Sequence, residues 1–490
     1  MFKLVRITLV TLNYINYINN GQVIVLKYSD YYGIMKAIKG VIEMAKATKA
    51  KKAKKAKLTK AEKKKRLKKA FLCVLGALVG VGAVLALTNM GVVNSCIKKT
   101  EEYKAVEYDD RVVPVKDENG GWVFKTDREL RVMQLTDVHF GGGFMSYEKD
   151  KMAINAVATM ITAEKPDLVI ITGDIAYPVP FQAGTFNNKS GAKILINLME
   201  QLGVYWTVTF GNHDSEAYSY YDRSEVSGFY SDENLKYCLY QAGPEEVDGY
   251  GNHTIRVENS KGITTHAFVM MDSHSYTDGD FLGIFWKYDN IHQNQVDWYE
   301  SEIVRISQNN MKLIRDNYEG DEASELLEKY YPVKSTAYFH IPLVEMKDAW
   351  FELEANGFKD TEDIKYIDGI IGETGKRIYP GIGEDNLFEK MEEMGSTKAV
   401  FNGHDHYNNV TFSKNDIIFS YGYSVDYLAY VGVSKEGSQR GCTMITIKED
   451  GNIEINKYNY YSDRYDLPGF EKEDVTMQFD GVEYQVPDEE

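Results

Sequence analysis

Three short polar motifs, each placed directly after an apolar segment, recur at nearly equal spacing along the chain. They are Asp137-Val-His139, Gly173-Asp174 and Gly211-Asn212-His213-Asp214. Asp174 lies 37 residues after Asp137, and Asn212 lies 38 residues after Asp174. That interval accommodates one strand, one helix and their connections, so the sequence predicts a βαβαβ run. Its parallel strands are expected to be joined by right-handed crossovers.

The hydrophobic pattern between the motifs supports this prediction. Strands are predicted at 131–136, 168–172 and 204–209, and helices at about 148–164 and 190–202. The second strand is continuously apolar, as expected where both faces of a parallel sheet are covered. The carboxyl ends of parallel strands meet at one edge of a sheet, where sites form in open α/β folds. The three motifs are therefore expected to lie together at that edge.

Two further groups of histidines follow predicted strands in the second half of the chain. His340 follows a strand at 335–339, and Gly403-His404-Asp405-His406 follows a strand at 398–401. All five motifs together offer carboxylate, amide and imidazole donors, which suit Fe, Mn or Zn better than Ca or a thiolate-bound metal. Two metals that share a bridging carboxylate can clamp a phosphate and generate hydroxide near neutral pH. The sequence therefore predicts a dinuclear metal centre.

In their order and spacing the motifs resemble those of the calcineurin-like metallophosphoesterases, over about residues 128–425. Longer strings such as Gln134-Leu-Thr-Asp-Val-His-Phe-Gly141 and Gly403-His-Asp-His-Tyr-Asn408 are similar to the purple-acid-phosphatase-related branch. The resemblance implies an α/β fold that is a four-layer α/β/β/α sandwich with two mixed β-sheets. This agrees with the βαβαβ run and the strand-rich second half predicted from the residues.

The resemblance also implies a role for each motif residue. The first metal ion would be held by Asp137, His139 and His406. The second would be held by Asn212, His340 and His404, with Asp174 bridging the pair. The leaving alkoxide would be protonated, or charge on the phosphate stabilised, by His213 with Asp214 orienting it.

Two other residues near the motifs have open roles. Tyr177 lies where true purple acid phosphatases have an iron-ligating tyrosine, but those proteins have glycine at the position of His139. Imidazole and phenolate would compete for one coordination position, so a packing or outer role for Tyr177 and a colourless Mn, Zn or Fe(II) enzyme are favoured. His274 follows a predicted strand at 267–271 and either reaches the substrate or serves a local turn.

An apolar run, 70–87, follows a Lys/Ala block at 46–69 that carries 14 basic residues and one acidic residue. The run is near the lower length limit for a membrane-spanning helix. Its basic flank favours an orientation with the lysines in the cytoplasm. A signal anchor is the favoured interpretation. A cleaved signal, including a lipoprotein signal ending at Val93-Asn-Ser-Cys96, and a buried helix of a soluble protein are the alternatives.

The predicted organisation has five parts. They are a basic, disordered leader (1–69), a transmembrane helix or signal sequence (70–93), a connector (94–125), a metallophosphoesterase domain (126–462) and an acidic, loosely packed C-terminal tail (463–490). Within the domain, a helical stretch is expected around 292–330 and further strands at 416–420, 442–447 and 453–459. The cysteines show no metal-binding spacing, and Cys238 and Cys442 are left as a pair that could form outside the cell.

The uneven charge narrows the choice of partners. Residues 1–69 carry a net charge of +16 and the remainder −33, so the main body would repel a nucleic-acid backbone. No nucleic-acid partner is expected. The favoured function is hydrolysis of a phosphorylated small-molecule or surface substrate by a membrane-anchored, extracytoplasmic enzyme; a secreted protein or lipoprotein is the alternative. Phosphomonoesters are preferred over phosphodiesters by resemblance alone, and a non-catalytic, surface-anchored binding protein is the alternative from another class.

Overall fold

A computed structural model of the chain describes residues 59–477 apart from 282, 376 and 436–438. The chain divides into two units, Met1–Gly82 and Ala83–Glu490. Helix α3 (Lys60–Thr100) begins in the first unit. Within the described residues it is the one helix long and apolar enough to cross a membrane, and its apolar segment is not buried. The helix is therefore consistent with a membrane anchor or a signal sequence. The part of the predicted leader up to residue 58 lies outside the described residues.

The predicted βαβαβ run is present. Strands β3 (Leu130–Leu135), β4 (Leu168–Thr172) and β5 (Tyr205–Thr209) pair in parallel, and α4 (Tyr147–Glu164) and α5 (Asn188–Leu202) form the crossovers. Two antiparallel strands, β13 (Gly441–Ile447) and β14 (Ile453–Asn459), extend this sheet on the side of β3. The resulting order is β14-β13-β3-β4-β5.

A second, nine-stranded sheet has the order β1-β2-β6-β7-β8-β10-β12-β11-β9. Its central strands β7 (Thr264–Met270), β8 (Lys334–Tyr338), β10 (Thr397–Asn402) and β12 (Ile417–Tyr421) are parallel. The flanking strands are β1 (Val115–Lys116), β2 (Trp122–Lys125), β6 (His253–Glu258), β9 (Ile364–Asp368) and β11 (Thr411–Lys414). Antiparallel pairing at β6, β9 and β11 makes this sheet mixed as well.

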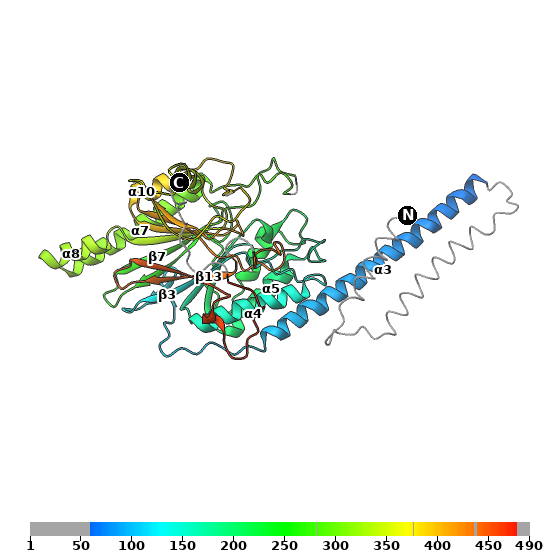
Figure 1. Cartoon of the computed structure of the whole chain (residues 1–490), viewed down its shortest axis with the longest axis horizontal. Coiled ribbons are helices and arrows are strands. Elements are labelled where there is room, and N and C mark those ends of the chain that lie inside the picture. The colour runs from blue at the N-terminus through cyan, green and yellow to red at the C-terminus, as the bar shows by residue number, and fades with distance from the viewer. Residues whose placement is uncertain (1–58, 282, 376, 436–438, 478–490) are drawn as a thin grey trace, which may run out of the picture. The chain divides into compact units, whose positions relative to one another are not determined.

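Helices cover the outer faces of both sheets (Figure 1). On the second sheet these are α7 (Gln293–Asn317), α9 (Val344–Ala355) and α10 (Leu387–Met394), while α8 (Gly320–Tyr330) follows α7 and α6 (Arg223–Tyr230) follows β5. Two short 3-10 turns, η2 (His213–Ser215) and η3 (Asp463–Tyr465), complete the elements.

Successive side chains of β4 point to opposite faces of the sheet, and the cores that they join show how the layers are stacked. Leu168 and Ile170 join a core between the two sheets, whereas Val169 and Ile171 join the core beneath α4 and α5. A third core lies between the second sheet and its helices, where Trp350 of α9 is fully buried. Both faces of β4 are covered, which explains why its sequence is continuously apolar. Three cores separate two helical layers and two sheets, so the predicted four-layer α/β/β/α sandwich is confirmed.

The last turns of α3 pack within the second unit. The side chain of Asn89 accepts a bond from the Phe144 amide at 2.9 Å and donates to the Gly184 carbonyl at 3.1 Å. Val93 is buried, and Cys96 belongs to the same core as α4 and α5. The lipoprotein alternative would place a lipid on the Cys96 sulfur. That sulfur is buried in the core, where no lipid chain could be accommodated, so its burial argues against this alternative.

The described part of the tail, 463–477, is mostly exposed, in line with its predicted loose packing, but it is anchored at a few points. Tyr465 is buried, and the ring of Phe470 stacks on Tyr103 with centroids 5.4 Å apart. Glu473 also pairs with Arg440 at 3.3 Å. These aromatic anchors hold the segment despite its acidic composition. The possible disulfide is not formed, since Cys238 and Cys442 are both free thiols.

Candidate metal centre

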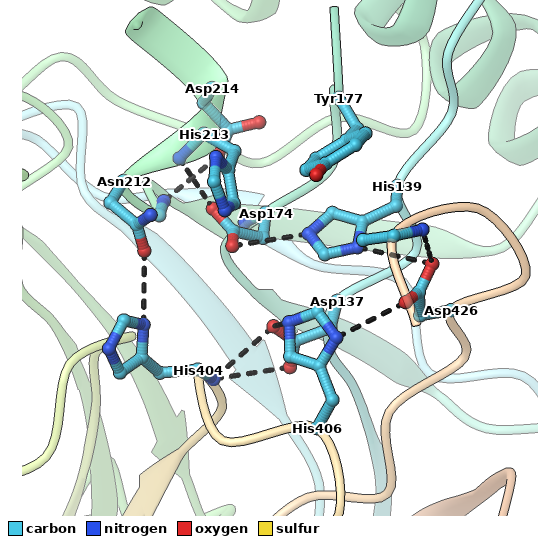
Figure 2. Close-up of polar contacts among 12 residues, drawn as sticks. Asp137, His139, Asp174, Tyr177, Asn212, His213, Asp214, His404, His406 and Asp426 are labelled. Atoms are coloured by element: carbon cyan, nitrogen blue, oxygen red, sulfur yellow. Dashed lines mark hydrogen bonds and ion pairs between the residues drawn. The ribbon is translucent and has the colours of Figure 1, made fainter. Parts of the chain in front are cut away.

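Loops at the carboxyl ends of β3, β4, β5, β8 and β10 bring the predicted ligands together. Figure 2 labels them apart from His340, which lies 3.2 Å from Asp174. Four of these residues have left-handed backbone, which non-glycine residues adopt rarely and which tends to cluster at active sites. Their φ angles are 51° at Asp137, 52° at His139, 52° at Asp174 and 81° at His404. Gly211 is required for close approach, because any side chain there would collide with the Asp174 carboxylate. The predicted convergence at one sheet edge is therefore observed.

The first ligand group consists of Asp137, His139, Asp174 and His406, whose ligand atoms all lie within 4.8 Å of one another. His139 Nε2 lies 3.2 Å from Asp174 Oδ2, and His406 Nε2 lies 3.3 Å from Asp137 Oδ1. All four side chains are buried. Mixed imidazole and carboxylate donors at this spacing fit a transition-metal ion.

The second ligand group shares Asp174 with the first. His340 Nε2 lies 3.2 Å from Asp174 Oδ2, and His404 Nδ1 lies 3.0 Å from Asn212 Oδ1. The rings of His340 and His404 are 5.2 Å apart and nearly perpendicular. Asp174 is therefore common to both groups and would contact both metal ions if they were bound.

The imidazole tautomers provide a test of whether these residues fit metal ions. His340 Nδ1 donates to the Thr172 carbonyl at 2.8 Å, so in the neutral ring the lone pair is on Nε2. That nitrogen is buried without a hydrogen-bond partner and faces the Asp174 carboxylate. A lone pair opposite a carboxylate is repulsive unless a cation or proton lies between them. The residues present therefore fit a metal ion at this position.

Protonation shows the same demand for positive charge. Burial disfavours charge on His139, but Asp426 and Asp174 outweigh it and raise the pKa of His139 to about 10. The pKa of His340 is likewise raised to about 9, against burial, by Asp174. The pKa of Asp174 is lowered well below its usual value, chiefly by His340 against the effect of burial. Protons on His139 and His340 therefore supply positive charge at the positions where metal ions would supply it.

Asp426, in the loop after β12, was not among the residues predicted from the sequence. Its two oxygens lie 3.3 Å from His139 Nδ1 and 3.2 Å from His406 Nδ1, behind the first ligand group (Figure 2). The carboxylate is buried and accepts backbone amides of Leu428, at 2.6 Å, and Ala429, at 2.8 Å. A carboxylate on the outer nitrogen of a histidine fixes which nitrogen is offered to a metal. Asp426 fixes two rings at once.

His213 lies at the rim of the centre, with 22% of its side chain exposed. Its Nδ1 pairs with Glu216 Oε1 at 2.7 Å, while its backbone amide donates to Asp174 Oδ1 at 2.8 Å. The orienting role predicted for Asp214 is wrong, because that carboxylate accepts four backbone amides at 2.8–3.0 Å, those of Asp174, Ile175, Ala176 and Gly211. Glu216 takes that role instead.

The sequence left the roles of Tyr177 and His274 undecided, and the structure shows what each of them contacts. The Tyr177 hydroxyl donates to Gln182 Oε1 at 2.8 Å, and its ring lies 4.8 Å from both His139 and His213. Burial raises the pKa of Tyr177, which opposes the phenolate form that a ligand would need. His274 stacks on His292 with ring centroids 4.1 Å apart, and its Nε2 lies 2.8 Å from Gln295 Oε1.

The match to a known protein family agrees with this arrangement. Residues 130–427 match the family model of the calcineurin-like phosphoesterases. Two relatives from Arabidopsis thaliana, named probable inactive purple acid phosphatases 28 and 14, are 24% and 26% identical over 63% of this chain and 73% of their own length. A solved dimetal phosphatase from Danio rerio has a TM-score of 0.40 at 9% identity, covering 66% of this chain and 98% of its own. The family match contains every residue of the centre, including Asp426.

Proposed function

The chain belongs to the calcineurin-like phosphoesterase family, and on that premise we propose that it hydrolyses phosphate esters, phosphomonoesters preferentially, at a dinuclear Fe, Mn or Zn centre. The observation that carries the proposal is the complete set of buried donors around Asp174. His139 Nε2, from one ligand group, and His340 Nε2, from the other, each lie 3.2 Å from its Oδ2. When bound, a metal pair neutralises charge on the phosphate and supplies a hydroxide nucleophile near neutral pH.

The chain's own residues position the substrate's leaving group. His213 is partly exposed at the rim, and its Nδ1 proton is held by Glu216. That contact leaves Nε2 as the nitrogen from which a proton can pass to a leaving oxygen. The Glu216 side chain is itself held by the Tyr276 hydroxyl, which donates at 3.3 Å. His213 is therefore oriented as a general acid.

The test uses the full-length protein in detergent, with p-nitrophenyl phosphate and its bis-ester as substrates. We expect chelator-sensitive hydrolysis with at least one of Mn, Zn or Fe(II), and a faster rate on the monoester. Asp174→Ala should abolish turnover, and His213→Ala should lower kcat by about 10²–10⁴. Asp167→Asn is the matched control, because Asp167 is a buried carboxylate at the opposite end of β4. Absence of hydrolysis with every metal would contradict the proposal.

A non-catalytic binding function is the second candidate, since the Arabidopsis relatives are named probable inactive. Under it, the metal-loaded centre would bind phosphate without turning esters over. Calorimetry with orthophosphate, beside the hydrolysis assay, separates the two functions. Saturable phosphate binding with no hydrolysis of either ester would favour the binding function.

We also propose that the centre works on the outer side of a membrane. The basic block at 46–69 followed by the apolar part of α3 supports this orientation. The test is protease treatment of intact cells that express a C-terminally tagged chain. Loss of the tagged domain from intact cells is expected, and protection until the cells are opened would overturn the proposed orientation.

A further inference from the structure

The loop between β4 and α5 runs from the dinuclear centre to the end of the apolar run of α3. Near its start, the Tyr177 ring lies 4.8 Å from both His139 and His213 (Figure 2). Near its end, the Gly184 carbonyl accepts a hydrogen bond from the Asn89 side chain at 3.1 Å. One short loop therefore connects the centre with the end of the apolar run.

The position of Asn89 determines where this loop lies when the apolar run crosses a bilayer. The run ends at Leu87, and the two helical residues that follow rise by about 3 Å. The headgroup layer on each side of the hydrocarbon core is about 5–7 Å thick. Asn89 and its two backbone partners, the Phe144 amide and the Gly184 carbonyl, then lie in that layer.

The segments bonded to Asn89 suit such a layer because they carry no charge. Residues 175–187 and 140–146 contain no acidic or basic side chain, although the chain after residue 69 has a net charge of −33. An uncharged surface is neither repelled by anionic headgroups nor costly to place beside acyl chains. This part of the domain can therefore lie against a bilayer that the rest of its acidic surface would avoid.

Phe181, in the same loop, is 87% exposed. The turn that carries it is ordered, since Ala183 is buried and the Gly184 amide donates to the Pro180 carbonyl at 3.1 Å. A single exposed apolar side chain is common on protein surfaces, but this one lies within one turn of the backbone bonded to Asn89. Its ring packs against nothing in the domain and is directed outward at the level of the headgroups.

A pair of aromatic side chains borders the same surface. Phe186 and Tyr220 are exposed, and their rings stack with centroids 6.3 Å apart. The Tyr220 amide also donates to the Phe186 carbonyl at 3.0 Å, which ties the β4–α5 loop to the segment that follows Glu216. Tyrosine has an apolar ring and a polar hydroxyl, so it is favoured at membrane–water interfaces.

We propose that the β4–α5 loop lies in the interfacial layer of a bilayer, with the Phe181 ring at the acyl boundary, and that the centre hydrolyses phosphomonoesters carried by lipids of that bilayer. The second half rests on the proposed function and names its substrate class. Gln182, next to Phe181, accepts the Tyr177 hydroxyl at 2.8 Å, so a short run of contacts links the lipid-facing turn to His213.

The reaction on a lipid phosphomonoester such as phosphatidate is a hydrolysis. A water molecule gives up a proton and adds to phosphorus, while the bond from phosphorus to the glycerol oxygen breaks. His213 protonates that oxygen. The products are diacylglycerol, which stays in the bilayer, and orthophosphate, which leaves.

The first test measures membrane contact and needs no activity. Full-length Phe181→Trp protein is reconstituted into phosphatidylcholine vesicles with brominated acyl chains, which quench tryptophan fluorescence on contact. The fluorescence that the substitution adds should be quenched there and present in unbrominated vesicles. Phe351→Trp is the matched control, because Phe351 is exposed on α9, in the opposite helical layer, and its added fluorescence should survive. Survival of the added fluorescence in Phe181→Trp would overturn the membrane contact.

The second test concerns the substrate class. Reconstituted proteins receive phosphatidate in vesicles or soluble glycerol 3-phosphate, which carries the same phosphomonoester group. Phe181→Ser should lower the ratio of phosphatidate to glycerol 3-phosphate hydrolysis by about 10-fold, the effect of about half the burial of one phenylalanine side chain. Phe351→Ser should keep the wild-type ratio, and an unchanged ratio in Phe181→Ser would overturn the lipid substrate. If neither ester is hydrolysed, the proposed function fails and the lipid substrate with it, while the quenching still decides the membrane contact.

Discussion

Replacing Asp426 by asparagine removes one charge from behind the first ligand group while keeping the shape of the side chain. Its Oδ1 accepts the amides of Leu428 and Ala429, so the asparagine oxygen is expected to remain there. The amide nitrogen must then face His406 Nδ1, where Oδ2 was 3.2 Å away, and also the Tyr430 backbone amide, which donates to Oδ2 in the wild type. Two donors cannot face each other, so His406 must move its proton to Nε2 or turn away.

Either response damages the first metal site. A proton on His406 Nε2 occupies the nitrogen that faces Asp137 at 3.3 Å and that would hold the metal. His139 keeps an oxygen behind it but loses the full negative charge. Loss of an outer carboxylate typically lowers metal affinity by about 10–100-fold, or about 1.4–2.7 kcal/mol. We expect the first metal to weaken by this amount and the second, whose ligands do not contact Asp426, to change little.

The assay is competition with chelators of graded affinity, followed by metal analysis of the full-length protein. One metal should be lost from Asp426→Asn at chelator concentrations that leave the wild type intact. Asp167→Asn, in which a buried carboxylate paired with Arg128 at 2.7 Å is neutralised, controls for loss of buried charge. Unchanged retention of both metals in a folded Asp426→Asn protein would refute the assigned role.

Three further predictions concern the centre. Asp174 and Glu216 hold the pKa of His213 above its usual value despite burial; Glu216→Gln should lower that pKa, and because the general acid acts protonated, the alkaline limb of the kcat profile should move to lower pH. An unchanged limb would show that Glu216 does not support the acid. Tyr177→Phe should retain both metals, and the wild type should lack an intense visible charge-transfer band; a band lost on this substitution would make Tyr177 a ligand. Since the pKa values of His139 and His340 are raised to about 10 and about 9, metal binding at pH 7.5 should release about two protons from these rings, in addition to any proton lost when a hydroxide forms. The release is measured by calorimetry in buffers of different ionisation enthalpy. Binding without proton release would contradict the raised values.

The parts of the fold that follow regular periodicity were predictable. Strands β3, β4 and β5 alternate between two cores or are covered on both faces, so their patterns are strong, and equal spacing then places their motifs at one edge. The edge strand β9 of the second sheet, Ile364–Asp368, gave no such signal, because only one of its five residues is fully buried. Helix α9, Val344–Ala355, directly follows the His340 loop and was likewise not predicted.

The residues that support the histidines from behind could not be predicted from the sequence, because local backbone geometry determines which side chains reach the outer nitrogens. Asp214 is adjacent to His213 in sequence, yet the 3-10 turn η2 directs it toward backbone amides and brings Glu216 to the imidazole. Asp426 lies 20 residues after His406 in a loop with no motif spacing. The one general signal for such residues is that metal-binding histidines need acceptors on their outer nitrogens.

The packing of Asn89, Val93 and Cys96 against the domain sets a boundary for any shortened form of the protein. A chain cut after Asn89 would lose the clamp on Phe144 and Gly184. A cut beyond Cys96 would also leave a hole in the core beneath α4 and α5. A shortened form that keeps all of these contacts must therefore begin before Asn89.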